Sequence, residues 1–156
     1  TILLKKMIPI KSNIISLQSK IGNIFSLQNK TINPDDKYSL GGNWLRGFDS
    51  YGAGPRDSST SYTGGNNLIV TKLDFIKPIN PNSETPIDLV VFTDTGLIWG
   101  NKDDPTSNEE SIRSSYGAGF RIYSPIGPIG FTWAFPIEDE SYDIKRMFLF
   151  SVGNLN

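Results

Sequence analysis

The chain has 156 residues, 37% of them hydrophobic, and its 15 basic and 16 acidic residues leave a net charge of −1. This length is that of one domain, and without a basic excess nucleic acid is a poor candidate partner. Because the chain contains neither cysteine nor histidine, disulfides, Cys–His or Ser–His–Asp catalytic sites and the common zinc ligand sets are excluded. We therefore expect no enzyme activity, no catalytic residue, no metal and no cofactor.

Hydrophobic residues recur with a period of two along most of the chain, which indicates β-strands rather than helices. Seven runs alternate in this way, the first of them less regularly: residues 1–9, 13–27, 66–76, 86–100, 114–125, 128–137 and 142–153. One face of these runs carries large apolar side chains. The other carries mainly Gly, Ser, Thr, Lys, Arg and Asp, including Asp74 and Asp94. The pattern predicts an all-β, antiparallel fold.

The length of the runs favours a membrane-spanning sheet over a soluble one. Most last about 9–15 residues, whereas soluble strands have a mode near 5–6 and a tilted strand needs about 9–11 residues to cross a bilayer. Connections also alternate between shorter ones, near 10–13, 78–86 and 125–128, and long polar ones, at 28–64, 100–113 and 137–142. This asymmetry is typical of outer-membrane barrels. A soluble antiparallel sandwich with one solvated face is the alternative.

The connection at 28–64 is long for a compact domain, and loops of that length are usually functional or disordered. Its glycines allow tight turns, and Leu45 and Phe48 supply apolar surface, so its tip can fold back on itself. Arg46 then needs partners in an enclosed space. The polar faces of the next two strands offer Asp74 and Asp94, and one planar guanidinium can bond both carboxylates. From spacing alone, a solvated Arg46 remains the alternative.

The segment LRGF (45–48) resembles the signature [V/L]RG[F/Y] of the bacterial surface antigen family, which includes the barrels of BamA-type outer-membrane protein assembly factors and two-partner secretion translocators. Other blocks resemble the family's pattern in the same order. They are LGG (40–42), GAGPRD (52–57), GGNN (64–67), FTDTGLIW (92–99), RSSYGAGFRIYSPIGPIGFTWAFPI (113–137) and FLFSVG (148–153). Together they cover roughly residues 38–153.

The resemblance implies an antiparallel transmembrane β-barrel of about sixteen strands in the bacterial cell outer membrane, with residues 1–156 as its C-terminal part. It also implies that the loop at about 28–64 folds into the lumen. Leu45, Arg46, Gly47 and Phe48 would form the motif of that loop, with Arg46 contacting Asp74 and Asp94.

The implied function is the folding and insertion of outer-membrane β-barrel proteins through a lateral seam between the first and last strands, where an incoming strand pairs with an exposed edge. Phe148, Phe150 and Gly153 would form half of that seam. Implied partners are unfolded outer-membrane β-barrel proteins, accessory assembly lipoproteins and outer-membrane lipid. Asn156 stands where the family usually has a terminal aromatic residue. Alternatives are a TamA-like or two-partner-secretion translocator barrel and a passive surface-antigen barrel.

Overall fold

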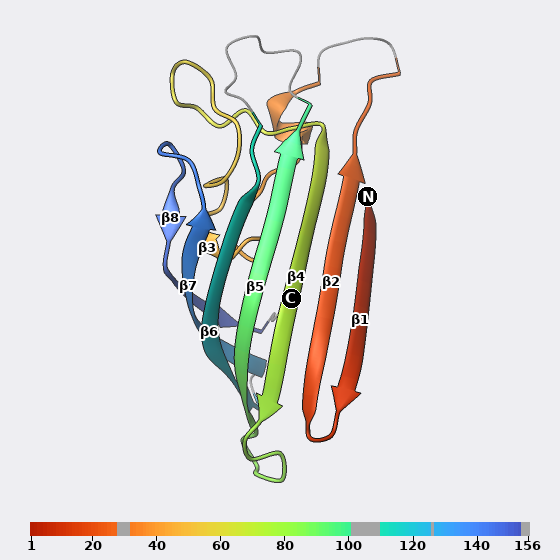
Figure 1. Cartoon of the computed structure of the whole chain (residues 1–156), viewed down its shortest axis with the longest axis vertical. Helices are drawn as coiled ribbons and strands as arrows, with labels where there is room; N and C mark the ends of the chain where they lie inside the picture. The colour runs from red at the N-terminus through yellow and green to blue at the C-terminus, as the bar shows by residue number, and fades with distance from the viewer. Residues whose placement is uncertain (28–31, 101–109, 126, 154–156) are drawn as a thin grey trace.

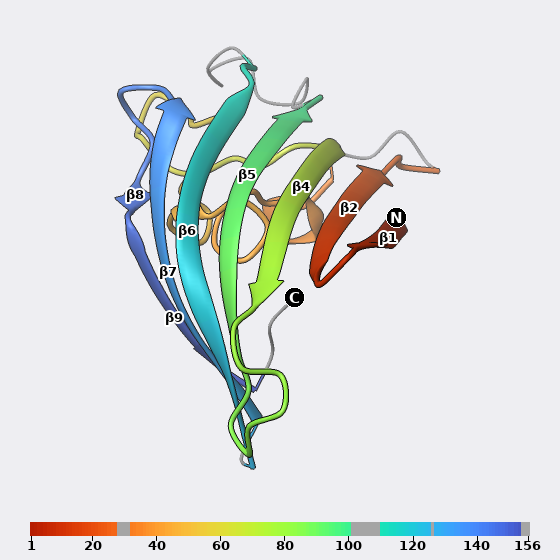
Figure 2. The ribbon, with the colours of Figure 1, turned by 60° about the horizontal axis from the view of Figure 1, so that its bottom comes forward.

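Seven strands form one antiparallel sheet in the order β1-β2-β4-β5-β6-β7-β9 (Figure 1; β9 is labelled in Figure 2). This computed structural model describes residues 1–27, 32–100, 110–125 and 127–153. The strands are β1 (Ile2–Ile10), β2 (Asn13–Asn23), β4 (Asn67–Pro78), β5 (Ile87–Trp99), β6 (Arg113–Ser124), β7 (Gly127–Glu138) and β9 (Phe148–Val152). Apart from the short strands β3 and β8, strands adjacent in the sheet follow one another in sequence. The predicted antiparallel fold of seven strands is confirmed, with one correction to the bounds of the last strand.

The sheet is strongly curved, and residues 32–66, the described residues that lead from the long loop into β4, lie on its concave side (Figure 2). This loop contains η1 (Pro34–Asp36), one turn of 3-10 helix, and the short strand β3 (Gly47–Phe48). Beyond β7, the two-residue strand β8 (Lys145–Arg146) pairs with β3, outside the main sheet. No helix within the described ranges is long and apolar enough to span a membrane.

Alternation along the strands separates two different faces, as the sequence predicted. On β5, Leu89 and Val91 are exposed on the convex face, whereas Val90 and Phe92 are buried on the concave one. Most of the large side chains exposed on the long strands are apolar, although polar residues such as Thr93 and Thr95 of β5 are exposed as well, and this is the composition of a surface that faces hydrocarbon.

The hydrophobic core lies between the long loop and the concave face of the sheet. The loop contributes Leu40, Leu45, Phe48 and Ala53, and the strands contribute Leu68, Val70 and Ile98. No second large sheet covers the first in the part of the chain that the structure describes. The loop therefore occupies the place that a second sheet has in a soluble sandwich.

The run at 142–153 is not one strand, which corrects the prediction. Met147 is the last residue that extends the pairing of β9 to β7, where its carbonyl accepts from Ala134 N over 2.9 Å. In an antiparallel ladder the next donor on that side of β7 is residue 136. Pro136 has no N–H, so the ladder ends there. Residues 145–146 pair instead with β3 in the long loop.

Gly153, predicted within the last strand, lies just after β9. Its N–H still donates to the carbonyl of Pro128 over 2.8 Å, so Gly153 remains attached to β7 without belonging to the strand. Asn156 lies outside the described residues.

Candidate functional site

The tip of the long loop is fixed on the concave wall by cations of the neighbouring strands. Lys72 on β4 donates from Nζ to the carbonyl of Asn43 over 2.6 Å. Lys20 on β2 places its Nζ 4.4 Å from the centre of the Trp44 ring, a cation–π contact. Both contacts are made by loop residues just before Arg46, so they orient the backbone that carries Arg46.

Arg46 is the centre of the site, with a side chain only 7% exposed. Its Nε donates to Asp94 Oδ2 over 2.7 Å and its Nη2 donates to Asp94 Oδ1 over 2.5 Å. Nη2 also donates to Asp74 Oδ1 over 2.6 Å. The backbone N–H of Arg46 donates to Asp94 Oδ2 over 3.1 Å. One carboxylate therefore holds both the backbone and the side chain of Arg46.

Two further side chains complete the surroundings of Arg46. The ring of Phe92 lies 3.5 Å from the guanidinium carbon, so the cation stacks on an aromatic face. On the other side, Arg121 of β6 donates from Nη2 to Asp74 Oδ2 over 3.1 Å. Since a charge removed from water needs compensation from nearby groups, this arrangement stabilises the buried guanidinium in place.

The structure brings together the residues that the sequence placed on the polar faces. Arg46 lies between Asp74 and Asp94, as the family resemblance implied, and not in solvent, which was the alternative from spacing alone. Leu45 and Phe48 are buried in the core beside it. Sequence reasoning did not include Lys72 and Arg121 in the cluster. Both fall on the lumen face in the same alternation, which was the available signal.

The residues predicted for the seam lie at the end of the sheet. β9 has β7 on one side and is the last strand in the sheet order of the described residues. Phe148 packs against Trp133 with ring centres 5.4 Å apart, and Phe150 packs against Phe131 at 5.2 Å. Both side chains are about half exposed on the convex face. They pack on side chains of the neighbouring strand β7.

These features define a class of protein. A curved antiparallel sheet with long strands, an apolar convex face and a loop ion-paired to its concave face is a portion of an outer-membrane β-barrel. The model of the Omp85 superfamily domain matches residues 1–155. The chain belongs to this superfamily. Its similarity to outer membrane protein assembly factors and to a BamA structure confirms the location in the bacterial outer membrane that the resemblance implied.

Relatives of known identity support the same assignment. The chain is 31% identical over 120 residues to the outer membrane protein assembly factor BamA of Neorickettsia risticii, and 29% identical over 123 residues to BamA of Nitratidesulfovibrio vulgaris. These matches cover 75% and 76% of the chain but only 16% and 15% of the relatives. A SAM50-like protein of Schizosaccharomyces pombe is 28% identical over 139 residues, covering 85% of this chain and 29% of that protein.

The fold is also found in a solved structure, the crystal structure of BamA from Haemophilus ducreyi lacking POTRA domains 1–3. The TM-score is 0.81 at 24% identity, and the match covers 95% of this chain and 33% of that one. The sheet described above is therefore one portion of a larger barrel of this type, and the predicted fold class is confirmed.

Proposed function

We propose that this chain is the C-terminal part of the barrel of an outer-membrane protein assembly factor, which folds and inserts other β-barrel proteins without making or breaking a covalent bond. The observation that carries the proposal is the LRGF loop, bound through Arg46 to two carboxylates inside a sheet that ends in a short strand. Relatives at about 30% identity are named as assembly factors of this kind.

The proposed mechanism uses the edge of β9 as a template. This strand has five residues, Phe148–Val152, opposite the twelve-residue strand β7, with one further backbone bond to β7 at each end. A strand with few ladder partners opens at lower cost than a long one, and an exposed edge then offers backbone groups to an incoming strand. The buried loop has the opposite effect on the barrel wall at β4 and β5. Its hydrophobic core and its ion pairs hold these two strands in one arrangement.

The proposed partners follow from this chemistry. Unfolded outer-membrane β-barrel proteins supply the incoming strands, and lipid contacts the apolar convex face. Accessory assembly lipoproteins are a further proposal, which the resemblance to BamA-type factors supports.

Depletion of the full-length protein tests the proposed function. We expect the levels of many different outer-membrane β-barrel proteins to fall together, as measured by quantitative mass spectrometry of isolated outer membranes. Restoration by the wild-type protein is the control for secondary effects. Loss of one secreted protein alone would instead identify a translocator. Unchanged levels of the outer-membrane proteins and of the secreted protein would identify a passive barrel.

A further inference from the structure

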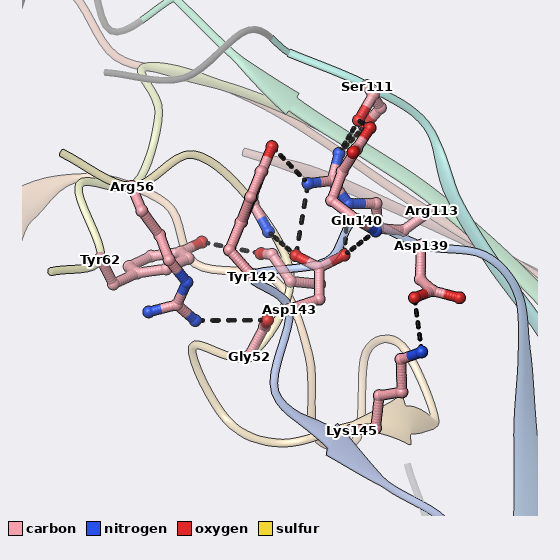
Figure 3. A network of polar contacts seen from close by, with 12 residues as sticks. Gly52, Arg56, Tyr62, Ser111, Arg113, Asp139, Glu140, Tyr142, Asp143 and Lys145 are labelled. Carbon is pink, nitrogen blue, oxygen red and sulfur yellow. Dashed lines mark hydrogen bonds and ion pairs between the residues drawn. The ribbon is translucent and has the colours of Figure 1, made fainter. Parts of the chain in front are cut away.

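A second buried ion pair, separate from that of Arg46, lies where three segments of the chain meet. Arg113, the first residue of β6, donates from Nε to Asp143 Oδ2 over 2.8 Å and from Nη2 to Asp143 Oδ1 over 3.3 Å. The two side chains are 1% and 0% exposed. Figure 3 shows the guanidinium directed at the carboxylate, with Tyr142 and Ser111 beside it. Both of these residues accept from Arg113.

Asp143 binds more than Arg113. Its Oδ2 also accepts from the backbone N–H of Glu140 over 2.8 Å, which closes the turn between β7 and β8. Its Oδ1 accepts from the backbone N–H of Gly54, in the long loop, over 3.4 Å. One carboxylate therefore joins β6, the 139–144 turn and the loop that carries Arg46.

The segment after Asp143 is attached to the same loop through its backbone. Ile144 accepts from Asp49 N and donates to the carbonyl of Gly52, both over 2.9 Å. The next two residues form β8, whose partner β3 contains Gly47 and Phe48. Residues 144–146 are thus an extension of the long loop rather than of the main sheet.

The backbone changes its partner between residues 146 and 147. Up to Arg146 it pairs with the loop, and from Met147 it pairs with β7. At this point β7 has no backbone N–H to donate, because residue 136 is proline. The partner of residues 143–146 therefore depends on the contacts that these residues make elsewhere. Those contacts begin at Asp143.

We infer that Arg113 and Asp143 are positioning residues for the last strand. By fixing the start of segment 143–146 on the loop, they hold the chain there up to the point where its pairing with β7 begins, and they link the docked loop to the edge formed by β9. Any effect on the strands of client proteins that pair with β9 rests on the proposed assembly function. The link between the docked loop and β9 does not.

Hydrogen–deuterium exchange of the full-length protein in detergent tests the link. Asp143→Asn keeps the shape of the side chain but removes its charge and leaves Arg113 buried without a counter-ion. We expect amide exchange to accelerate at least about tenfold at residues 144–146 and 47–54, because a broken buried pair lowers local stability. Exchange at Asp74 and Asp94 should stay at the wild-type rate. Asp139→Asn is the matched control, since Asp139 lies in the same turn but pairs with the half-exposed Lys145.

A second pair of variants separates positioning from general destabilisation. Arg113→Lys keeps the charge but not the two-pronged geometry, so we expect a smaller acceleration at the same residues. Asp49→Cys with Arg146→Cys, joined by a short thiol cross-linker, should restore slow exchange at residues 144–146 in the Asp143→Asn protein. The native ion pair between these positions spans 3.1 Å.

The outcomes are distinct. Wild-type exchange at residues 144–146 in both Asp143→Asn and Arg113→Lys would overturn the inference, as would a uniform acceleration across the barrel that the cross-link does not reverse. If Asp143→Asn does not fold, the inference is tested by exchange in Arg113→Lys, with and without the cross-link between positions 49 and 146. Because exchange is independent of client assembly, a failed depletion experiment with a positive exchange result would reject the proposed function and retain the link.

Discussion

Asp94 Oδ2 accepts from both the backbone N–H and the side-chain Nε of Arg46, over 3.1 Å and 2.7 Å. A side-chain contact alone would fix the guanidinium but leave the loop backbone free to shift. The shared oxygen fixes both at once, and Asp94 itself is fully buried on the rigid strand β5. One residue of the barrel wall therefore holds both the backbone and the side chain of Arg46.

Arg46→Ala should destabilise the docked loop. It leaves two buried carboxylates without their main partner, which typically costs about 3–5 kcal/mol. Arg46→Lys should also lose much of the stability, because an ammonium does not reproduce the bidentate contact with Asp94. The measurement is the free energy of unfolding of the full-length protein in detergent. Lys145→Gln is the control, and its half-exposed ion pair should contribute less than about 1 kcal/mol.

Asp94→Asn should cost more stability than Asp74→Asn. Asp94 accepts three hydrogen bonds from Arg46 and is fully buried, whereas Asp74 accepts one from Arg46 and shares its other oxygen with Arg121. Removal of the Asp94 charge therefore weakens more of the hydrogen bonds of the Arg46 guanidinium than removal of the Asp74 charge does. Unfolding midpoints of the two variants, measured side by side, test the order. Equal midpoints would show that the two carboxylates hold Arg46 equivalently.

Gly41→Ala should release the loop from the wall. Gly41 has φ +126°, and an added Cβ would lie 1.9 Å from the carbonyl oxygen of Asp49. Gly153→Ala is the matched control, since Gly153 also has a positive φ of +82° but has nothing within 4 Å of such a Cβ. Backbone strain of about 1 kcal/mol applies to both, so the difference reports the clash. Limited proteolysis should cleave the loop faster in Gly41→Ala only, and equal cleavage would contradict the close approach.

Tyr62 should make stability fall at high pH. Burial raises the pKa of its phenol from 10.0 to about 12. Its hydroxyl donates to the carbonyl of Ala53 and accepts from Leu40 N. Since the folded state prefers the neutral phenol, this contribution is complete below about pH 10 and is lost as pH rises through about 12.

The free energy of unfolding, measured against pH, tests this titration. In that window, wild type should lose up to about 1.4 kcal/mol per pH unit more than Tyr62→Phe. Tyr51→Phe is the control, because Tyr51 is exposed. Parallel curves for wild type and Tyr62→Phe would show that Tyr62 titrates normally.

The strands and the Arg46 contacts could be predicted because they depend on local patterns. A period of two fixes which residues share a face, so Asp74 and Asp94 had to lie on the wall that the loop covers. The LRGF resemblance then supplied the partner. Neither step requires knowledge of the loop's path.

The contacts of the last loop could not be predicted in the same way. Arg113 and Asp143 are 30 residues apart, and their pairing depends on the turn at 139–144 and on the path of the long loop. The alternation of side chains also predicted a last strand that begins at residue 142. Alternation shows which face a side chain occupies, but it does not show whether the neighbouring strand has a backbone N–H to donate. Pro136 was visible in the sequence, and its missing N–H was the signal that the ladder to β7 would end.

A double-mutant cycle between Arg46 and Asp94 tests the docking of the loop most directly. The free energies of unfolding of wild type, Arg46→Ala, Asp94→Ala and the double variant are measured in the full-length protein. Since the two side chains are in direct contact, we predict a coupling energy of about 2–3 kcal/mol. If the two losses add to within about 0.5 kcal/mol, as they do for residues that share no contact, Arg46 does not hold the loop on Asp94.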